Sequence, residues 1–92
     1  GDAEGAMKIL RELAAAPNAA EPHFNMCLVY QENLGDQEKA LASCETFARL
    51  AGPQDPKYKA VQMRIDGIRA TIEILRETEN APKAPAPEPE TP

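Results

Sequence analysis

The side chains best suited to chemistry in this 92-residue chain are a single histidine and two cysteines. A metal site usually draws on several His, Cys or carboxylate ligands, and a cysteine nucleophile needs a neighbouring base. His23 is the only histidine, and we expect it to be a half-exposed residue in the first turn of a helix. The sequence also has no glycine-rich phosphate loop. We therefore predict no catalytic residues, no metal ligands and no cofactor, and hence a protein that is not an enzyme.

The two cysteines, Cys27 and Cys44, fall on the facing apolar stripes of two predicted helices. Two states are open to such a pair. Cysteines in an oxidising compartment often form a disulfide, but a free cysteine is also a good small core residue. Because disulfide geometry is demanding, we favour two buried free thiols.

The elements that must position these residues are helices. The chain has four aromatic residues and no Trp, so its core must be built from small and aliphatic side chains, and good helix formers dominate. Apolar residues recur at spacings of three and four, the helical period. The sequence predicts an all-α domain over residues 1–79 and a disordered tail, rich in Pro, Ala and Glu, over 80–92. The predicted helices span about 3–16, 21–33, 36–51 and 56–77.

Composition and charge exclude two classes of partner. The formal net charge is −5, which gives no basic face for nucleic acid. No apolar run approaches the roughly 20 residues that a transmembrane helix needs. We therefore expect neither nucleic-acid binding nor a transmembrane segment.

Turn residues mark the ends of the predicted helices. Gly35 suits a left-handed C-cap, and Asp36 suits the N-cap of the helix that follows. Asp55 suits an N-cap in the same way, with Pro56 in the first turn of the fourth helix.

The chain also repeats itself at a fixed shift, which carries Gly1 to Gly35. The run Gly-Asp-Ala-Glu-Gly-Ala-Met at 1–7 aligns with Gly-Asp-Gln-Glu-Lys-Ala-Leu at 35–41. The same shift carries Pro22 to Pro56 and Phe24 to Tyr58. A single shift of 34 residues therefore relates two turns, two helix caps and two helix starts.

A helix–turn–helix period of about 34 residues is the mark of the tetratricopeptide repeat, and this chain resembles that family. The run His-Phe-Asn-Met-Cys-Leu-Val-Tyr at 23–30 is similar to the pattern of its first helix, and Leu-Gly-Asp at 34–36 to its inter-helix turn. Ala40, Phe47 and Ala48, with the proline at 53, resemble the positions of its second helix.

The resemblance covers residues 1–75, but only one repeat, at about 21–53, is whole. It departs from the family pattern at Arg64, where Tyr is expected, and by one extra residue around 31–33. We interpret the long fourth helix as a terminal cap, and we expect the chain to begin in the middle of a repeat.

The resemblance implies a concave face that binds a protein or peptide partner. Asn25 is similar to an asparagine with which many such repeats bind a ligand backbone or terminal carboxylate, and with Lys59 it would hold an acidic or C-terminal peptide. The alternative is that Asn25 is a plain surface amide. The expected face comprises Asn25, Leu28, Gln31, Glu32, Lys59, Gln62 and Asp66.

Two functions follow as hypotheses. The first is a non-catalytic scaffold that recruits a peptide or subunit into an assembly. One resembled group comprises bacterial repeat lipoproteins that assist pilus or secretin assembly in the cell envelope. The alternative is a structural subunit permanently embedded in a larger complex through its helix faces. An uncovered stripe on the first helix (Ala6, Leu10 and Leu13) offers a site for self-association. The compartment stays open between bacterial cytoplasm and periplasm.

Overall fold

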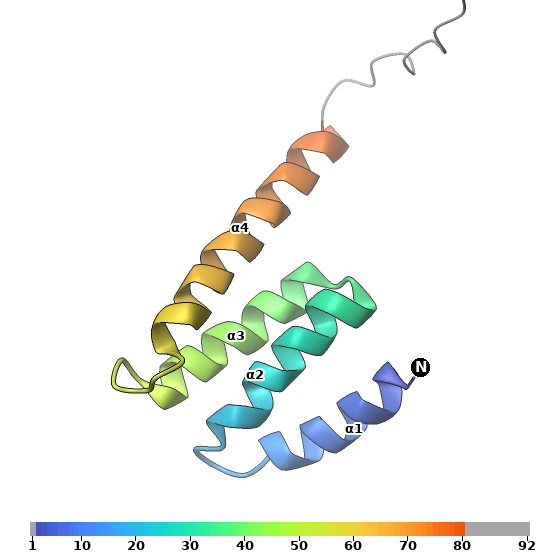
Figure 1. The fold of residues 1–92 in the computed structure, drawn as a ribbon. Helices are drawn as coiled ribbons and strands as arrows, with labels where there is room; N and C mark the ends of the chain where they lie inside the picture. The colour runs from blue at the N-terminus through green and yellow to red at the C-terminus, as the bar shows by residue number, and fades with distance from the viewer. Residues whose placement is uncertain (1, 81–92) are drawn as a thin grey trace, which may run out of the picture.

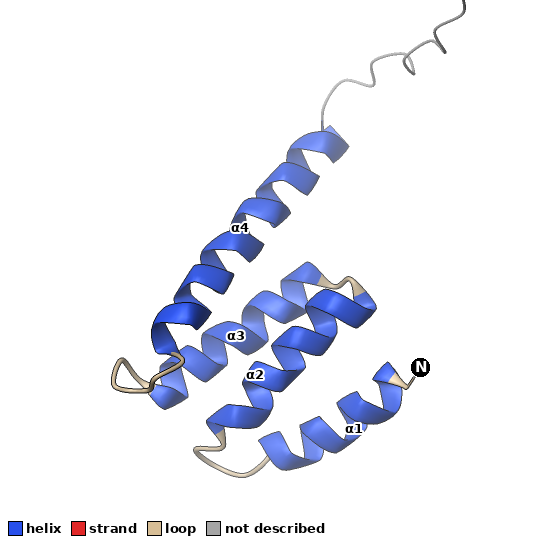
Figure 2. Cartoon of the chain, viewed as in Figure 1, coloured by secondary structure: helices blue, strands red, loops and turns tan. Residues whose placement is uncertain are grey.

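The computed structural model describes residues 2–80, and within them the chain is helical with no strand (Figures 1 and 2). The predicted all-α class is confirmed. No helix in this range is both long and apolar enough to span a bilayer. The predicted disordered tail falls almost wholly on residues 81–92, outside the described range. The helices are α1 (Ala3–Ala14), α2 (Ala20–Val29), a π-helical turn η1 (Tyr30–Leu34), α3 (Gln37–Ala51) and α4 (Tyr58–Asn80).

Helices α2 and α3 form a tight hairpin whose turn follows the predicted residues. Gly35 adopts the left-handed conformation (φ 65°, ψ 22°), and its N–H donates to the Tyr30 carbonyl. Asp36 caps α3 by accepting from the Lys39 N–H at 3.0 Å. The extra residue expected around 31–33 lies inside η1, since a π turn is the usual way for a helix to absorb a one-residue insertion.

The sequence repeat is visible in the backbone. Asp2 caps α1 by accepting from the Gly5 N–H at 3.2 Å, and Asp36, its counterpart in the repeat, makes the same i to i+3 bond at the start of α3. The first main-chain bonds match as well, from Ala6 to Asp2 at 2.9 Å and from Ala40 to Asp36 at 3.0 Å. Helices α1 and α3 therefore begin with the same kind of cap.

The core is centred on α3, which packs against α2 on one side and α4 on the other (Figure 1). A small residue, Ala40, is fully buried, which lets the helices approach closely. Phe47 is also fully buried, and its ring lies 5.5 Å from that of Phe24 on α2. From α4 the core takes Val61, Ile65, Ile68 and Ile72.

Cys27 and Cys44 form a disulfide between α2 and α3. The two Cα atoms are 5.3 Å apart and both residues are completely buried. Our preference for free thiols was therefore wrong. The hairpin holds the two facing positions within the Cα separation that a disulfide requires.

Three helix ends differ from the predicted ones by two or more residues. One of them is the end of α4, which continues to Asn80 where 77 was predicted and so includes the first residue assigned to the tail. Helix α1 ends at Ala14 because Ala15 and Ala16 donate to carbonyls three residues back, in tighter turns, before Pro17. Helix α4 begins at Tyr58 and not at 56. The carboxylate of Asp55 accepts from the Lys57 N–H at 2.8 Å, so a separate turn precedes the helix.

Candidate partner-binding face

The residues predicted for the concave face come from α2, η1 and α4. Asn25, Glu32, Lys59 and Asp66 are exposed. The other three, Leu28, Gln31 and Gln62, are half-buried. The exposed members offer an amide, two carboxylates and an ammonium group to a partner, with apolar area supplied by Leu28.

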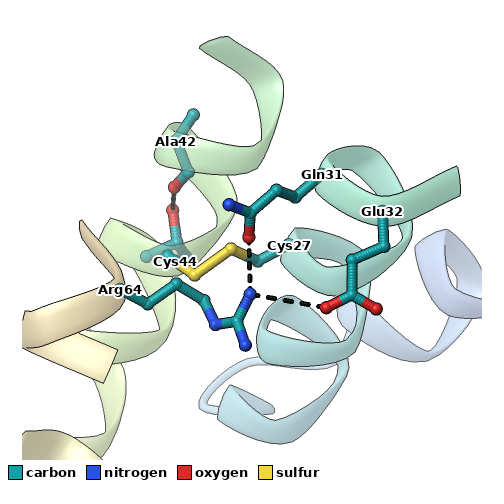
Figure 3. Close-up of a disulfide and its surroundings, with 7 residues drawn as sticks. Cys27, Gln31, Glu32, Ala42, Cys44 and Arg64 are labelled. Atoms are coloured by element: carbon teal, nitrogen blue, oxygen red, sulfur yellow. Dashed lines mark hydrogen bonds and ion pairs between the residues drawn. A yellow bond between two sulfur atoms is a disulfide. The ribbon is translucent and has the colours of Figure 1, made fainter. Parts of the chain in front are cut away.

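Arg64 joins α4 to η1 (Figure 3). Its guanidinium reaches from α4 and donates to Gln31 Oε1 at 2.5 Å, and it lies 3.6 Å from a carboxylate oxygen of Glu32. The guanidinium is partly buried, so the bond to Gln31 is better shielded from water than an exposed pair. From the sequence, Arg64 stands out only because the repeat pattern expects a tyrosine there. An arginine at a packing position could have predicted this contact, since a partly buried charge requires a polar partner.

The structure gives Asn25 and Lys59 separate surroundings. Within residues 2–80, no hydrogen bond or ion pair joins them, and Lys59 has no ion-pair partner. The lysine that meets α2 is Lys57. It pairs with Glu21, and its ammonium nitrogen lies 5.4 Å from the centre of the Phe24 ring. Lys57 therefore ties the start of α4 to the start of α2.

A hollow of about 330 Å³ lies between the η1–α3 turn and the second half of α4, a region that sequence analysis did not single out. Leu34 and Leu75 line it and are both exposed. In its wall, Gln37 Oε1 is buried and accepts no hydrogen bond from any described residue. Leu75 follows the buried Ile72 at the helical spacing of three, yet it is half exposed.

The apolar stripe expected to be uncovered on α1 is covered in part. Leu10 packs against the core, and Met7 beside it is fully buried. The residues left open are Ile9, at 59 % exposure, and Leu13, at 55 %. The prediction of an uncovered stripe was therefore wrong for Leu10 and omitted Ile9. The reason is that α2 covers the side of α1 that carries Met7 and Leu10, and the exposed side carries Ile9 and Leu13.

The described residues contain no group of three or more His, Cys, Asp or Glu placed to hold a metal ion. His23 is half-buried near the start of α2, and both cysteines are committed to the disulfide. Besides the hollow beside Leu34, a second one of about 400 Å³ lies between α3 and α4, lined by Leu41, Arg69 and Glu73 among others.

Comparisons with protein-family models, with curated proteins and with solved structures gave no match to this chain.

Proposed function

We propose that this chain is a tetratricopeptide-type interaction module that recruits a peptide or subunit into a larger assembly and carries out no reaction itself. The observation that carries the proposal is the recurrence of one cap at the repeat shift. Asp2 and Asp36 make the same bonds at the starts of α1 and α3. Repeats of this kind stack helical hairpins so that each covers its neighbour, and they use the resulting surfaces for binding.

The binding face in this proposal is the surface of α2, η1 and α4 that Arg64 holds together. Asn25 supplies an amide to the ligand backbone or terminal carboxylate, and Lys59 supplies a positive charge. Because Lys59 has no ion-pair partner among residues 2–80, binding an acidic ligand would break no existing pair. The ligand class is thus a peptide with a free carboxyl terminus or acidic side chains.

A peptide library tests this proposal. Twelve-residue peptides with free carboxyl termini, titrated against the oxidised chain by fluorescence polarisation, should include binders that lose affinity when their termini are amidated. Asn25→Ala should weaken those binders by about tenfold, as contacts at a binding centre do. Lys8→Glu, an exposed charge on α1, serves as the control. Binding that is unaffected by Asn25→Ala would refute the assignment of this face.

The compartment enters as part of the proposal. A buried disulfide persists in oxidising surroundings such as the bacterial periplasm and is rare in the cytosol. Because Cys27 and Cys44 are bonded, we place the module in the cell envelope. This location agrees with a role in assembling pilus or secretin components, which the family resemblance suggested.

A second candidate, a subunit permanently embedded in a complex, draws on one observation. Ile9 and Leu13 of α1 correspond, at the repeat shift, to Ser43 and Phe47 of α3, both of which are buried in the core. On α3 that face is covered, and on α1 it is open. Size-exclusion chromatography separates the two candidates, because an embedded subunit would aggregate when expressed alone, whereas a recruiting module would elute as a discrete species.

A further inference from the structure

Helix α4 carries a second apolar stripe on the side away from its core residues. Its members follow one another at spacings of three, four, three and four, which is the seam of a two-helix coiled coil. All five are exposed, Met63 at 70 % and Ile74 at 61 %. The stripe consists of Ala60, Met63, Gly67, Ala70 and Ile74.

Nothing within residues 2–80 explains the glycine at the centre of this stripe. A glycine inside a helix costs roughly 0.5–1 kcal/mol relative to alanine. At Gly67 the backbone is helical, and an added Cβ would meet no atom within 4 Å. A glycine at such a position allows another backbone to approach closely, and within residues 2–80 no element occupies this side of α4.

We propose that the stripe binds α4 of a second copy, antiparallel, in a two-fold dimer that crosses near Gly67. In that arrangement a large side chain meets a small one of the partner subunit. In an antiparallel seam each a position of the heptad in one helix faces a d position of the other, so Met63 lies against the partner's Gly67, and Ala60 against the partner's Ala70. The stripe is thus complementary in size to itself, as the interface of a two-fold dimer must be.

Charges beside the stripe select the antiparallel orientation. Lys59 and Glu73 occupy equivalent flanking positions two heptads apart, both are exposed, and neither has an ion-pair partner within the described part of the chain. An antiparallel pair places Lys59 opposite the partner's Glu73 at both ends. A parallel pair would instead bring Lys59 to the partner's Arg64, with like charges facing each other.

Asp66 lies midway between those two residues and therefore near the two-fold axis. The antiparallel dimer brings it close to the partner's Asp66, a repulsion that the two Lys59–Glu73 pairs outnumber. Asp66→Asn should consequently tighten the dimer. This effect is specific to the proposed geometry, since Asp66 is far from its own copy in any contact made through α1.

Sedimentation equilibrium of the full 92-residue chain tests the proposal. The wild-type chain should show a monomer–dimer equilibrium, and Met63→Glu should abolish the dimer. Ile9→Glu, which alters an equally apolar and exposed residue on α1, should leave it intact. A wild-type chain that stays monomeric at millimolar concentration, or a dimer lost in Ile9→Glu and kept in Met63→Glu, would overturn the proposal.

Charge reversal tests the orientation independently. Lys59→Glu alone and Glu73→Lys alone should each weaken the dimer, because each turns both attractive pairs into repulsive ones. An equimolar mixture of the two variants should form a heterodimer, since positions 59 and 73 of the two chains then face each other with opposite charges at both ends. The double variant K59E/E73K should dimerise as the wild type does. If neither the mixture nor the double variant recovers the dimer, the antiparallel arrangement is wrong. All variants keep the core residues, and helical circular dichroism verifies that each one folds.

Discussion

At the residue scale, two glycines show how one residue type serves opposite purposes in this fold. Gly35 has φ 65°, a value that strains any residue with a Cβ, whereas Gly67 lies in a regular helix. Neither position is crowded, because an added Cβ would meet nothing within 4 Å at either one. The two positions therefore differ only in backbone conformation.

Alanine substitution should change the free energy of unfolding in opposite directions at the two glycines. Gly35→Ala should lower the free energy of unfolding by about 1 kcal/mol, the cost of a left-handed alanine. Gly67→Ala should raise it by a similar amount, the gain in helix propensity. Urea titrations at a single low protein concentration measure both. Equal signs would contradict the backbone conformations described here.

Gly35 and Asp36 were predicted correctly from residue type, because a left-handed cap and a helix N-cap have strong chemical preferences. The bond between Cys27 and Cys44 was not, because a disulfide depends on an approach of two side chains that spacing alone does not fix. The contacts of Arg64 were not predicted either, for the same reason. Its partners, Gln31 and Glu32, lie on a different helix far back in the chain, and only the packing of α4 brings them together.

At the element scale, the hairpin depends on how closely α2 and α3 approach. Ala40 is fully buried in α3, whereas Ala42 on the same helix is exposed. Ala40→Leu should cost about 1–3 kcal/mol through overpacking, and Ala42→Leu should change stability little. Chemical denaturation followed by circular dichroism gives both values. Similar stability for the two variants would mean that the helices do not meet at Ala40.

The disulfide fastens the same hairpin at a second point. Its cysteines are 17 residues apart, and closing a loop of about that length in the unfolded chain stabilises the fold by about 3 kcal/mol. Reductant should lower the unfolding midpoint of the wild-type chain by a corresponding amount. The double variant Cys27→Ala/Cys44→Ala should be insensitive to reductant. A wild-type midpoint that does not respond would show that the bond is absent or contributes nothing.

Periodicity predicted the number, order and approximate extent of the helices, since each one has a continuous apolar face. It did not predict where α4 begins, because the bonds made by Asp55 compete with the first helical turn. It also did not separate the two stripes of α4. The core stripe, with Val61 and Ile65, is aliphatic and stands out, whereas the second stripe is mostly alanine and glycine and resembles ordinary helix surface.

At the scale of the whole molecule, stability and self-association are linked. A second copy that binds only the folded chain shifts the unfolding equilibrium by mass action, so the melting temperature of a dimer rises with protein concentration. The helical part of the chain, about 80 residues, is near the lower size limit for a stable single domain. Because the stability of one chain alone should be modest, the additional stability from pairing of α4 with its copy should be measurable.

Differential scanning fluorimetry across a hundredfold range of concentration should show the wild-type melting temperature rising. Met63→Glu should melt at one temperature throughout, and Ile9→Glu should follow the wild type. Raising the salt concentration should reduce the slope, because the Lys59–Glu73 pairs lie at the surface and are screened. It should not remove the slope, since the contacts along the stripe are apolar. A slope shared by all three proteins would place the association elsewhere than on α4.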